Sequence, residues 1–452
     1  FSKNNQKFKE ALSKVGTSIH FGPHYDETAA LSDWHIPKAH YLESWGDCES
    51  LDGTVSIVQP LISPLYAQAY SDLDLLYMLK NPSGYKKVKS METAYKVIRD
   101  RYRGSWTKYL HNGIVKTNSN TLSDKDKNKI EKFNPSKDSS GISAGNEIVF
   151  YTSNQVYDGR FANNSWLQES PDPISKVTWD NVALISEKTA KELKVKNKEF
   201  LSLSFNGATV EVPTWILPGQ ADGQISLQVG YGRDFKSRVA KSVGRNVYPL
   251  MNGALSNSSV KVSGTGILAT IACTQDHHGM DADDSFSNSE IQDRLPDIYR
   301  EMELEDYKDY GGYNFVAKRD KKKHLKIDGK MKTLYDNPYE KYYDSPEREN
   351  GYDKPYDSED PPQWGMTIDL NSCTGCNSCS IACQSENNIP TVGKDQVAKG
   401  REMSWIRTDR YFKGTDADNP EVAFQPVTCM HCENAPCEQV CPVSATVHDK
   451  EG

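Results

Sequence analysis

The pattern of apolar and polar positions divides the chain into segments with different predicted secondary structure. Over residues 84–110, apolar side chains recur at steps of three and four with lysine and arginine between them, which predicts one amphipathic helix. Ahead of it, residues 53–60 form an apolar run that ends at Pro60 and predicts a buried strand, followed by a leucine-rich segment over residues 73–79. Residues 1–115 therefore have the pattern of an α/β domain remnant.

A period of two replaces the helical period further along the chain. Residues 182–185 predict a short strand, and Ser186 can cap the helix that follows it. Alternating apolar residues then predict a hairpin around the Asn206-Gly207 turn and one further strand. These residues are Leu201, Leu203, Phe205, Val210, Val212, Ile225, Leu227 and Val229. Pro213 is expected to end the second strand at an edge or bulge. The pattern predicts a closed or nearly closed β domain over residues 145–275.

Two segments lack the apolar pattern of a core. Residues 116–144 are rich in serine, asparagine, lysine and aspartate, which predicts an exposed linker. Residues 281–360 hold 22 acidic and 14 basic residues, and ten of the 24 tyrosines of the chain. We expect the surrounding segment, residues 276–363, to be an arm that lies along other surfaces with its rings docked. Its basic run, residues 318–323, predicts a solvated loop, with docking to an acidic partner as the alternative.

The composition excludes several classes of protein. A length of 452 residues suggests two to four domains. With 54 basic and 62 acidic residues, the chain has no electrostatic reason to bind nucleic acid. No stretch approaches the roughly 18 uncharged apolar residues that span a bilayer, so we expect no transmembrane helix of its own. The chain starts at Phe1 rather than methionine and stops directly after a cysteine motif, so we expect a piece of a longer protein, whose signal peptide would then be hidden.

Eight of the ten cysteines fall in two tight runs. The first run is Cys373, Cys376, Cys379 and Cys383, and the second is Cys429, Cys432, Cys437 and Cys441. The first spacing is that of bacterial ferredoxins, with three thiolates on one compact loop and the fourth on the following helical turn. These eight cysteines are therefore the predicted iron ligands of [4Fe-4S] clusters. A pair of zinc knuckles is the alternative. The other two, Cys48 and Cys273, are expected to be buried free thiols rather than a disulfide.

Clusters held by four thiolates leave no open position for a substrate, so the predicted role is single-electron transfer, with no catalytic residue in this chain. Small residues between the first ligands let backbone N–H groups approach the sulfurs, which raises the reduction potential. They are Thr374, Gly375, Asn377 and Ser378. Four basic residues could act in the same direction by charge, or could simply face solvent: Lys394, Arg401, Arg407 and Arg410. His431 and His448 are available as ligands or hydrogen-bond donors, although an ordinary loop histidine is the simpler interpretation.

Longer motifs resemble the B subunit of bacterial alternative complex III, a fusion of two parts. The iron–sulfur part is carried by residues 368–379, 382–390, 400–407 and 429–432, and the part similar to molybdopterin oxidoreductases by residues 31–37, 45–47, 52–60, 158–164 and 227–233. The resemblance implies a multidomain α/β plus β fold. Its parts would be a molybdopterin-oxidoreductase-like α/β remnant over 1–115, a linker over 116–144, a double-psi β-barrel-like domain over 145–275, an acidic tyrosine-rich arm over 276–363, and a truncated ferredoxin-like domain over 364–452.

The resemblance also implies a function. It implies a quinol-oxidising respiratory complex that passes electrons through four clusters, one of them [3Fe-4S], towards haem-carrying subunits and a terminal oxidase. Its partners would be an integral-membrane quinol-binding subunit and multihaem cytochrome c subunits, on the periplasmic face of the membrane. In this family the front half resembles an enzyme that has lost its molybdopterin. The positions that would face a pterin are Asn163, Asn164, Gly230, Gly232 and Arg233. Residues 276–278, Asp-His-His, suggest a metal or haem ligand, or a hydrogen-bonded loop pair at the exit of the barrel.

The pairing of the cysteine runs stays open. By analogy with related four-cluster subunits, the first run would pair with a fourth run beyond Gly452 and the second with a third, and Cys383 and Cys441 would each complete a further cluster. If the chain ended at Gly452, Cys441 would complete the first cluster and Cys383 the second. Two other functions also stay open: an active molybdopterin-dependent oxidoreductase of the polysulfide or thiosulfate reductase type with a fused series of clusters, and a scaffold that organises neighbouring subunits.

Overall fold

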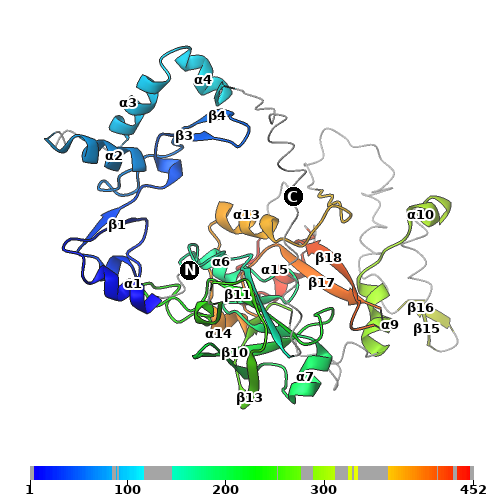
Figure 1. The fold of residues 1–452 in the computed structure, drawn as a ribbon. Coiled ribbons are helices and arrows are strands. Elements are labelled where there is room, and N and C mark those ends of the chain that lie inside the picture. Colours follow the sequence, from blue (N-terminus) through cyan, green and yellow to red (C-terminus); the bar gives the residue numbers. More distant parts are fainter. Residues whose placement is uncertain are drawn as a thin grey trace, which may run out of the picture. The chain divides into compact units, whose positions relative to one another are not determined.

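The computed structural model describes residues 5–83, 88, 91–116, 145–251, 253–275, 289–310, 324–327, 330–333, 365–414, 416–430 and 435–447 (Figure 1). Several predictions fall outside these residues: the linker over residues 117–144, the Asp-His-His run, the basic run over residues 318–323, His431, Cys432 and His448. The architecture is mixed α/β and multidomain, with a curled sheet.

The chain forms two compact units. The first consists of Phe1–Phe150, Ser204–Val210 and Gly230–Lys261, and the second of Tyr151–Leu203, Glu211–Val229 and Val262–Gly452. The domain boundaries expected from the sequence remain predictions.

The first unit contains short strands and helices. In chain order they are α1 (Asn5–Leu12), β1 (Ile19–Gly22), η1 (Ala29–Leu31), β2 (Trp34–Pro37), η2 (Tyr41–Glu43), β3 (Gly46–Glu49), β4 (Val55–Val58), α2 (Asp72–Lys80), α3 (Glu92–Arg101), α4 (Trp106–Asn112), β5 (Ile114–Lys116), β6 (Glu147–Thr152), α8 (Tyr248–Met251) and β12 (Ser256–Asn257). β1 and β2 are parallel, β3, β4 and β5 form an antiparallel sheet, and β12 is antiparallel to β6. The strand predicted over residues 53–60 is confirmed as β4, in which Ile57 is buried. The leucine-rich segment is α2, capped by Ser71.

The single helix predicted over residues 84–110 is wrong. α3 and α4 are separate helices, with Gly104 in the break between them. Tyr102 leaves the helical conformation, and its hydroxyl donates to Oδ2 of Asp47 at 2.5 Å. A glycine lowers helix propensity by about 1 kcal/mol relative to alanine, and the bond to Asp47 competes with continuing the helix.

Apolar residues nevertheless keep a helical spacing on both sides of this break, because α3 and α4 pack against the same group of aromatic rings. The rings of Trp45, Tyr95 and Trp106 pack with centroids 5.1 to 6.0 Å apart. Ala94 and Ile98 of α3 are fully buried. A stripe with helical spacing therefore persists in the sequence although the helix itself does not.

The remaining elements lie mainly in the second unit. They are α6 (Ser165–Glu169), β7 (Val177–Thr178), β8 (Ala183–Ile185), α7 (Glu187–Leu193), β9 (Glu199–Phe205), β10 (Ala208–Ile216), β11 (Gln224–Val229), β13 (Lys261–Leu268), β14 (Ala272–Cys273), α9 (Ser289–Ile298), α10 (Leu304–Tyr310), β15 (His324–Ile327), β16 (Lys330–Thr333), α13 (Ser378–Glu386), α14 (Lys394–Val397), β17 (Arg407–Lys413), β18 (Glu421–Val427) and α15 (Pro436–Val440).

The strands predicted around the Asn206-Gly207 turn are confirmed. β11, β8, β10, β9 and β13 lie side by side in that order. Asn206 and Gly207 have φ of 48° and 81°, the left-handed pair that a type I′ hairpin turn needs. The helix cap is also confirmed, since Ser186 Oγ accepts from the backbone N–H of Thr189 at the start of α7. Leu203 and Leu227 are fully buried, as the alternating pattern predicts.

Pro213 does not end its strand, so that prediction is wrong. β10 continues to Ile216 and lies between β8 and β9 rather than at an edge. Its parallel pairing with β8 begins only at Thr214, which lies opposite Ala183. The proline is tolerated because it precedes the first position at which β10 pairs with this neighbour.

The two isolated cysteines differ in burial. Both are free thiols. Cys273 is buried, as predicted, in a core group that includes Val177, Val182 and Ile271. Cys48 is exposed, so the prediction of a buried thiol is wrong there. It lies in β3, an edge strand of its three-stranded sheet, where side chains have neighbours on one side only.

The described start of the acidic arm docks on the hairpin formed by β17 and β18. Gln292 of α9 donates to the carbonyl of Phe412 at 3.4 Å and accepts from the N–H of Gly414 at 3.2 Å. The ring of Tyr299 packs on that of Tyr411, with centroids 5.5 Å apart. A docked ring is therefore present at the first tyrosine of the arm. None of the helices in the described part of the chain has the length and apolar character needed to cross a membrane.

Candidate functional site

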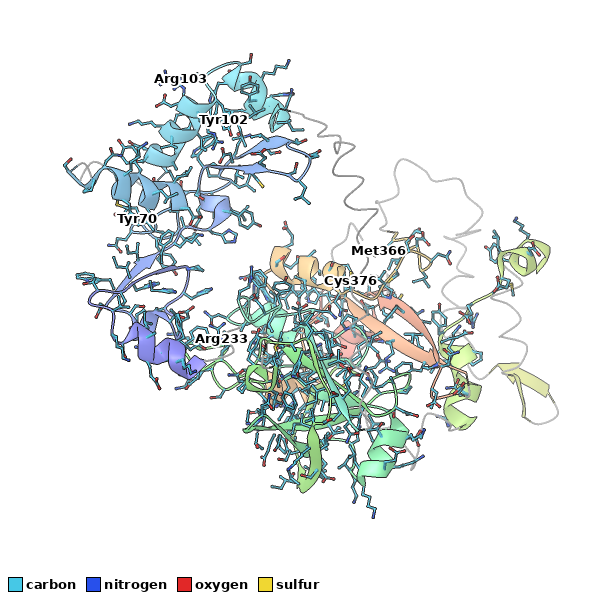
Figure 2. The ribbon with its side chains drawn as sticks, viewed as in Figure 1. Tyr70, Tyr102, Arg103, Arg233, Met366 and Cys376 are labelled. Carbon is cyan, nitrogen blue, oxygen red and sulfur yellow. The ribbon has the colours of Figure 1, made fainter. Side chains whose placement is uncertain are left out.

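The first cysteine run lies on a loop and the helix after it. Cys376 is labelled in Figure 2 in the loop before α13, and Cys373 precedes it in the same loop. Cys379 and Cys383 both lie on α13, which begins at Ser378. The expectation of three loop thiols is corrected here, because the helix starts one residue before the third cysteine.

The second run follows the hairpin. Cys429 comes after β18, Cys437 lies on α15, and Cys441 is the residue at the C-terminal end of α15. The seven cysteines of the two runs that the structure describes are exposed or half-buried free thiols. Within the described residues, no three cysteine, histidine or carboxylate side chains come together as a metal-binding group.

Left-handed backbone shapes the first cysteine loop, defined here as residues 373–377. Gly375 has φ of 68°, and a Cβ placed on it would lie 2.3 Å from Cδ1 of Phe424 in β18. Asn377 has φ of 62°, is buried, and donates from its side chain to the carbonyl of Pro171 at 2.8 Å. Glycine and asparagine are the residue types that adopt this conformation at least cost, so both positions fit their residues.

Hydrogen-bond donors surround two of the thiol sulfurs. The Cys376 thiol donates to Oγ of Ser378 at 3.2 Å. Once this thiol is deprotonated, the hydroxyl and N–H of Ser378 donate to the thiolate, and this holds the pKa of Cys376 below its ordinary value. The N–H of Ala445 donates to Sγ of Cys441 at 3.1 Å, and with that of Val443 it lowers the pKa of Cys441. Such donors stabilise thiolates, the form that binds iron, so the residues present fit an iron–sulfur cluster.

The basic residues predicted to act on the clusters are mostly bonded to local partners. Lys394 pairs with Asp180 at 2.6 Å, Arg401 donates to Gln396 at 2.9 Å, and Arg407 donates to Asp409 at 3.0 Å. Arg410 differs, because its Nε donates to the backbone carbonyl of Ile174 at 2.9 Å and burial lowers its pKa to about 10.

A segment distant in sequence anchors the region between the two runs. Glu169 accepts from the N–H groups of Val392 and Gly393 at distances from 2.8 to 3.1 Å, and from the indole of Trp179. The indole of Trp166 donates to the carbonyl of Ile389 at 2.7 Å. α6 therefore lies beside α13 and helps to fix the segment after it (Figure 1).

Sequence reasoning missed the residues that hold the first cysteine loop from a distance. Pro171 and Phe424 belong to no motif, and nothing local in the sequence marks their contacts. The left-handed positions could have been found, since glycine and asparagine between closely spaced ligands indicate positive φ.

The positions predicted to face a pterin have contacts inside the protein. Arg233 donates to both carboxylate oxygens of Glu27, at 2.9 and 2.6 Å. A Cβ on Gly232 would lie 2.0 Å from the backbone N of Asn246, so that glycine is required by packing. Asn164 caps α6 through its side chain. Gly230 has φ of 101°, and Asn163 lies just before the cap.

Residues 372–445 match the 4Fe-4S dicluster domain family. The iron–sulfur cluster-binding subunit of menaquinone reductase from Nitratidesulfovibrio vulgaris is 41% identical over 90 residues, which are 20% of this chain and 35% of that protein. The B subunit of polysulfide reductase from Wolinella succinogenes is 37% identical over 91 residues, 20% of this chain and 42% of that protein. Iron–sulfur subunit 1 of the Hdr-like menaquinol oxidoreductase from Archaeoglobus fulgidus is 26% identical over 114 residues, 22% of this chain and 41% of that protein.

The chain thus spans less than half the length of these curated relatives. Among solved structures, acetylene hydratase from Pelobacter acetylenicus has a TM-score of 0.43 and 13% identity, covering 57% of this chain and 42% of that one. A likeness of that size does not establish a shared fold. The carboxyl-terminal segment is a 4Fe-4S dicluster domain, and this favours iron–sulfur clusters over zinc knuckles.

Proposed function

We propose that this chain is the iron–sulfur electron-transfer subunit of a membrane-associated quinol oxidoreductase. It would carry electrons from quinol oxidation towards cytochrome c haems or a terminal oxidase. One observation carries the proposal: residues 372–445, which match the 4Fe-4S dicluster domain family, hold two tight cysteine runs, and the first has ferredoxin spacing.

The relatives support the part of the proposal that concerns quinones. Two of them are named as iron–sulfur subunits of a menaquinone reductase and of a menaquinol oxidoreductase. The matches cover 20% and 22% of this chain and 35% and 41% of those two proteins. The substrate, the partners and the direction of electron flow are therefore proposals for the whole protein.

The residues of this chain have a defined part in such a function. A bound cluster supplies single-electron transfer. The eight cysteines would hold such clusters through thiolates, four to a cluster. Ser378 and Ala445 would donate to thiolate sulfurs and so favour the more negative, reduced state. Contacts from α6 and from Pro171 keep the cysteine-bearing segment in one position, which electron transfer between fixed centres needs.

More specifically, we propose that the complex is of the alternative complex III type. This assignment rests on the motifs in both halves of the sequence, in the order found in that family. It adds an integral-membrane quinol-binding subunit, multihaem cytochrome c subunits, a position on the periplasmic face and one [3Fe-4S] cluster in the full-length protein. It also adds the domain boundaries given above, with a double-psi barrel over residues 145–275 and no bound molybdopterin.

Cysteine substitution tests the electron-transfer role. We expect the purified chain to contain iron and acid-labile sulfide and to give low-temperature paramagnetic resonance signals after dithionite reduction. Cys376→Ser should remove or convert one cluster, and in the assembled complex it should sharply reduce the rate at which quinol reduces the haems. Cys273→Ser is the matched control, because it removes a buried thiol outside both runs.

Two results would contradict the proposal. A colourless protein without sulfide or paramagnetic signals contradicts the clusters themselves. Unchanged quinol-driven turnover in Cys376→Ser contradicts electron flow through that centre. Metal analysis decides the competing function, because stoichiometric molybdenum with bound pterin would make the chain an active molybdopterin oxidoreductase.

A further inference from the structure

A buried lysine lies behind the first cysteine loop. Lys176 is the largest fully buried side chain in the described part of the chain, with 1% of its surface exposed. Its backbone has φ of 61°, donates to the carbonyl of Asp172 at 3.0 Å and accepts from the N–H of Thr274 at 3.0 Å. Among the described residues, its Nζ has no hydrogen-bond partner. A charged group held in this way acts on its surroundings through its field rather than through a bond.

The ammonium group faces an aromatic ring. Nζ of Lys176 lies 5.7 Å from the centroid of Phe424. Phe424 pairs across the hairpin with Arg410, a second cation, whose guanidinium lies 4.1 Å from the centroid of Phe412. Burial lowers the pKa of Lys176 to about 8, so the group is mainly protonated at neutral pH. The other charged or titratable groups that face it are Asp172, Asp409, Arg410 and Cys273.

The nearest carboxylate is already bonded to other groups. Oδ1 of Asp172 accepts from the N–H groups of Ile174 and Ser175 and from the Ser175 hydroxyl, and Oδ2 accepts from Gln228 at 2.9 Å. Its charge therefore offsets one of the two cations, Lys176 and Arg410. The other carboxylate, Asp409, is paired with Arg407 at 3.0 Å. A net positive charge therefore remains on this side of the hairpin.

The same ring touches the cysteine loop. A Cβ on Gly375 would lie within 2.3 to 2.7 Å of three ring atoms of Phe424, so the loop backbone rests directly on the ring. Phe424 thus contacts the Lys176 ammonium and the loop that carries Cys373 and Cys376. Lys176 is buried beside this ring, and a low local dielectric strengthens the effect of its charge.

We infer that Lys176 is a positioning residue for electron transfer, whose ammonium raises the reduction potential of the cluster held by the first cysteine loop, acting across the Phe424 ring. Reduction adds one negative charge to the cluster, and a buried cation stabilises that state more than the oxidised one. This inference rests on the proposed function only in that a cluster must form on this loop.

A redox titration followed by paramagnetic resonance tests the inference on the full chain. The variants are Lys176→Met and Lys176→Gln, which remove the charge, and Lys176→Arg, which keeps it. We expect both neutral variants to shift the midpoint potential of one cluster to more negative values, and Lys176→Arg to restore it. Lys198→Met is the matched control, because Lys198 also has left-handed backbone and lies 5.8 Å from the centroid of another ring, that of Trp215.

Intact clusters with unchanged potentials in Lys176→Met overturn the inference and leave the proposed function standing. A wild-type protein that forms no cluster overturns both. If neither neutral variant folds, the pH dependence of the midpoint potential in the wild-type protein tests the inference instead. This potential should fall as pH rises from about 7 to 9.5, because the Lys176 charge is lost over this range. The same fall is expected in Cys273→Ser. A potential that is constant with pH overturns the inference.

Discussion

The side-chain amide of Asn377 donates to the backbone carbonyl of Pro171 at 2.8 Å, across 206 positions of the sequence. Asn377 lies between two predicted iron ligands, Cys376 and Cys379, and only 2% of its surface is exposed. The first cysteine loop is therefore held by a segment that lies outside the 4Fe-4S dicluster domain at residues 372–445.

Substitution of Asn377 tests that connection. Asn377→Ala loses the hydrogen bond, about 1 kcal/mol, and forces alanine into left-handed backbone, a further cost of about 1 to 2 kcal/mol. Asn377→Gly loses the bond but tolerates the backbone, so it should be the more stable of the two by about 1 kcal/mol. Denaturant unfolding, with iron content measured in parallel, checks the order. Equal stability of the two variants would show that the backbone conformation is not required.

The predictions that succeeded are local ones. The Asn206-Gly207 turn and the Ser186 cap each depend on residues within four positions of one another, so a few neighbouring side chains specify them. The cysteine runs are also local, and their role as iron ligands stays a prediction. The pattern could not reveal the break at Gly104, because α3 and α4 keep their apolar residues on one aromatic group.

Contacts between segments that lie far apart in the chain could not be predicted from the sequence. Pro171 accepts from the first cysteine loop through its backbone carbonyl, a group that every residue has, so its side chain carries no signal. Phe424 alternates in β18 as an ordinary strand residue would. Lys176 was not singled out, because the expectation for a lysine is exposure. The eight cysteines stay predicted ligands of the candidate site, and the residues that support the first cysteine loop were not predicted.

Gly375→Ala should disrupt the first cysteine loop through its contact with the Phe424 ring. The overlap at 2.3 Å adds roughly 1 to 3 kcal/mol of overpacking to the strain of left-handed alanine. Gly400→Ala is the matched control, because Gly400 has a nearly identical φ of 66° with nothing within 4 Å of its Cβ position. We expect iron and sulfide per chain to fall in Gly375→Ala and to stay at the wild-type level in Gly400→Ala. The same cluster content in both variants would contradict a close ring contact.

Glu169→Gln should loosen the segment between the two cysteine runs. The carboxylate is 4% exposed and accepts from Val392, Gly393 and Trp179, whereas a glutamine would turn a donor NH2 group towards some of these N–H groups. Buried hydrogen bonds to a charged group contribute about 1.5 to 3 kcal/mol, so we expect a loss of about 2 kcal/mol in the free energy of unfolding.

Glu187→Gln provides the comparison for that loss. Glu187 pairs with Lys191 four residues later on the surface of α7, at 2.7 Å. Such pairs contribute about 0.3 to 0.5 kcal/mol. Indole fluorescence during denaturant unfolding measures both variants. A loss in Glu169→Gln no larger than that in Glu187→Gln would argue against an anchoring role.

The ion pair of Glu27 and Arg233 should make the first unit sensitive to acid. Burial raises the pKa of Glu27, but hydrogen bonds and charge from Arg233 more than offset it, so the folded pKa lies below the unfolded one. Such a group adds stability above its unfolded pKa, near 4.3, and this stability is lost as pH falls through the folded pKa.

Because Glu27 is 37% exposed, solvent screening limits the contribution of the ion pair to about 1 kcal/mol. Glu27→Gln should therefore be less stable than wild type by about that amount at pH 7. The difference should shrink as pH falls below the unfolded pKa and disappear below the folded one. A double-mutant cycle with Arg233→Met, measured by denaturant unfolding at neutral and at acidic pH, isolates the coupling energy between Glu27 and Arg233. A stability difference between Glu27→Gln and wild type that persists in acid would contradict the ion pair as its source.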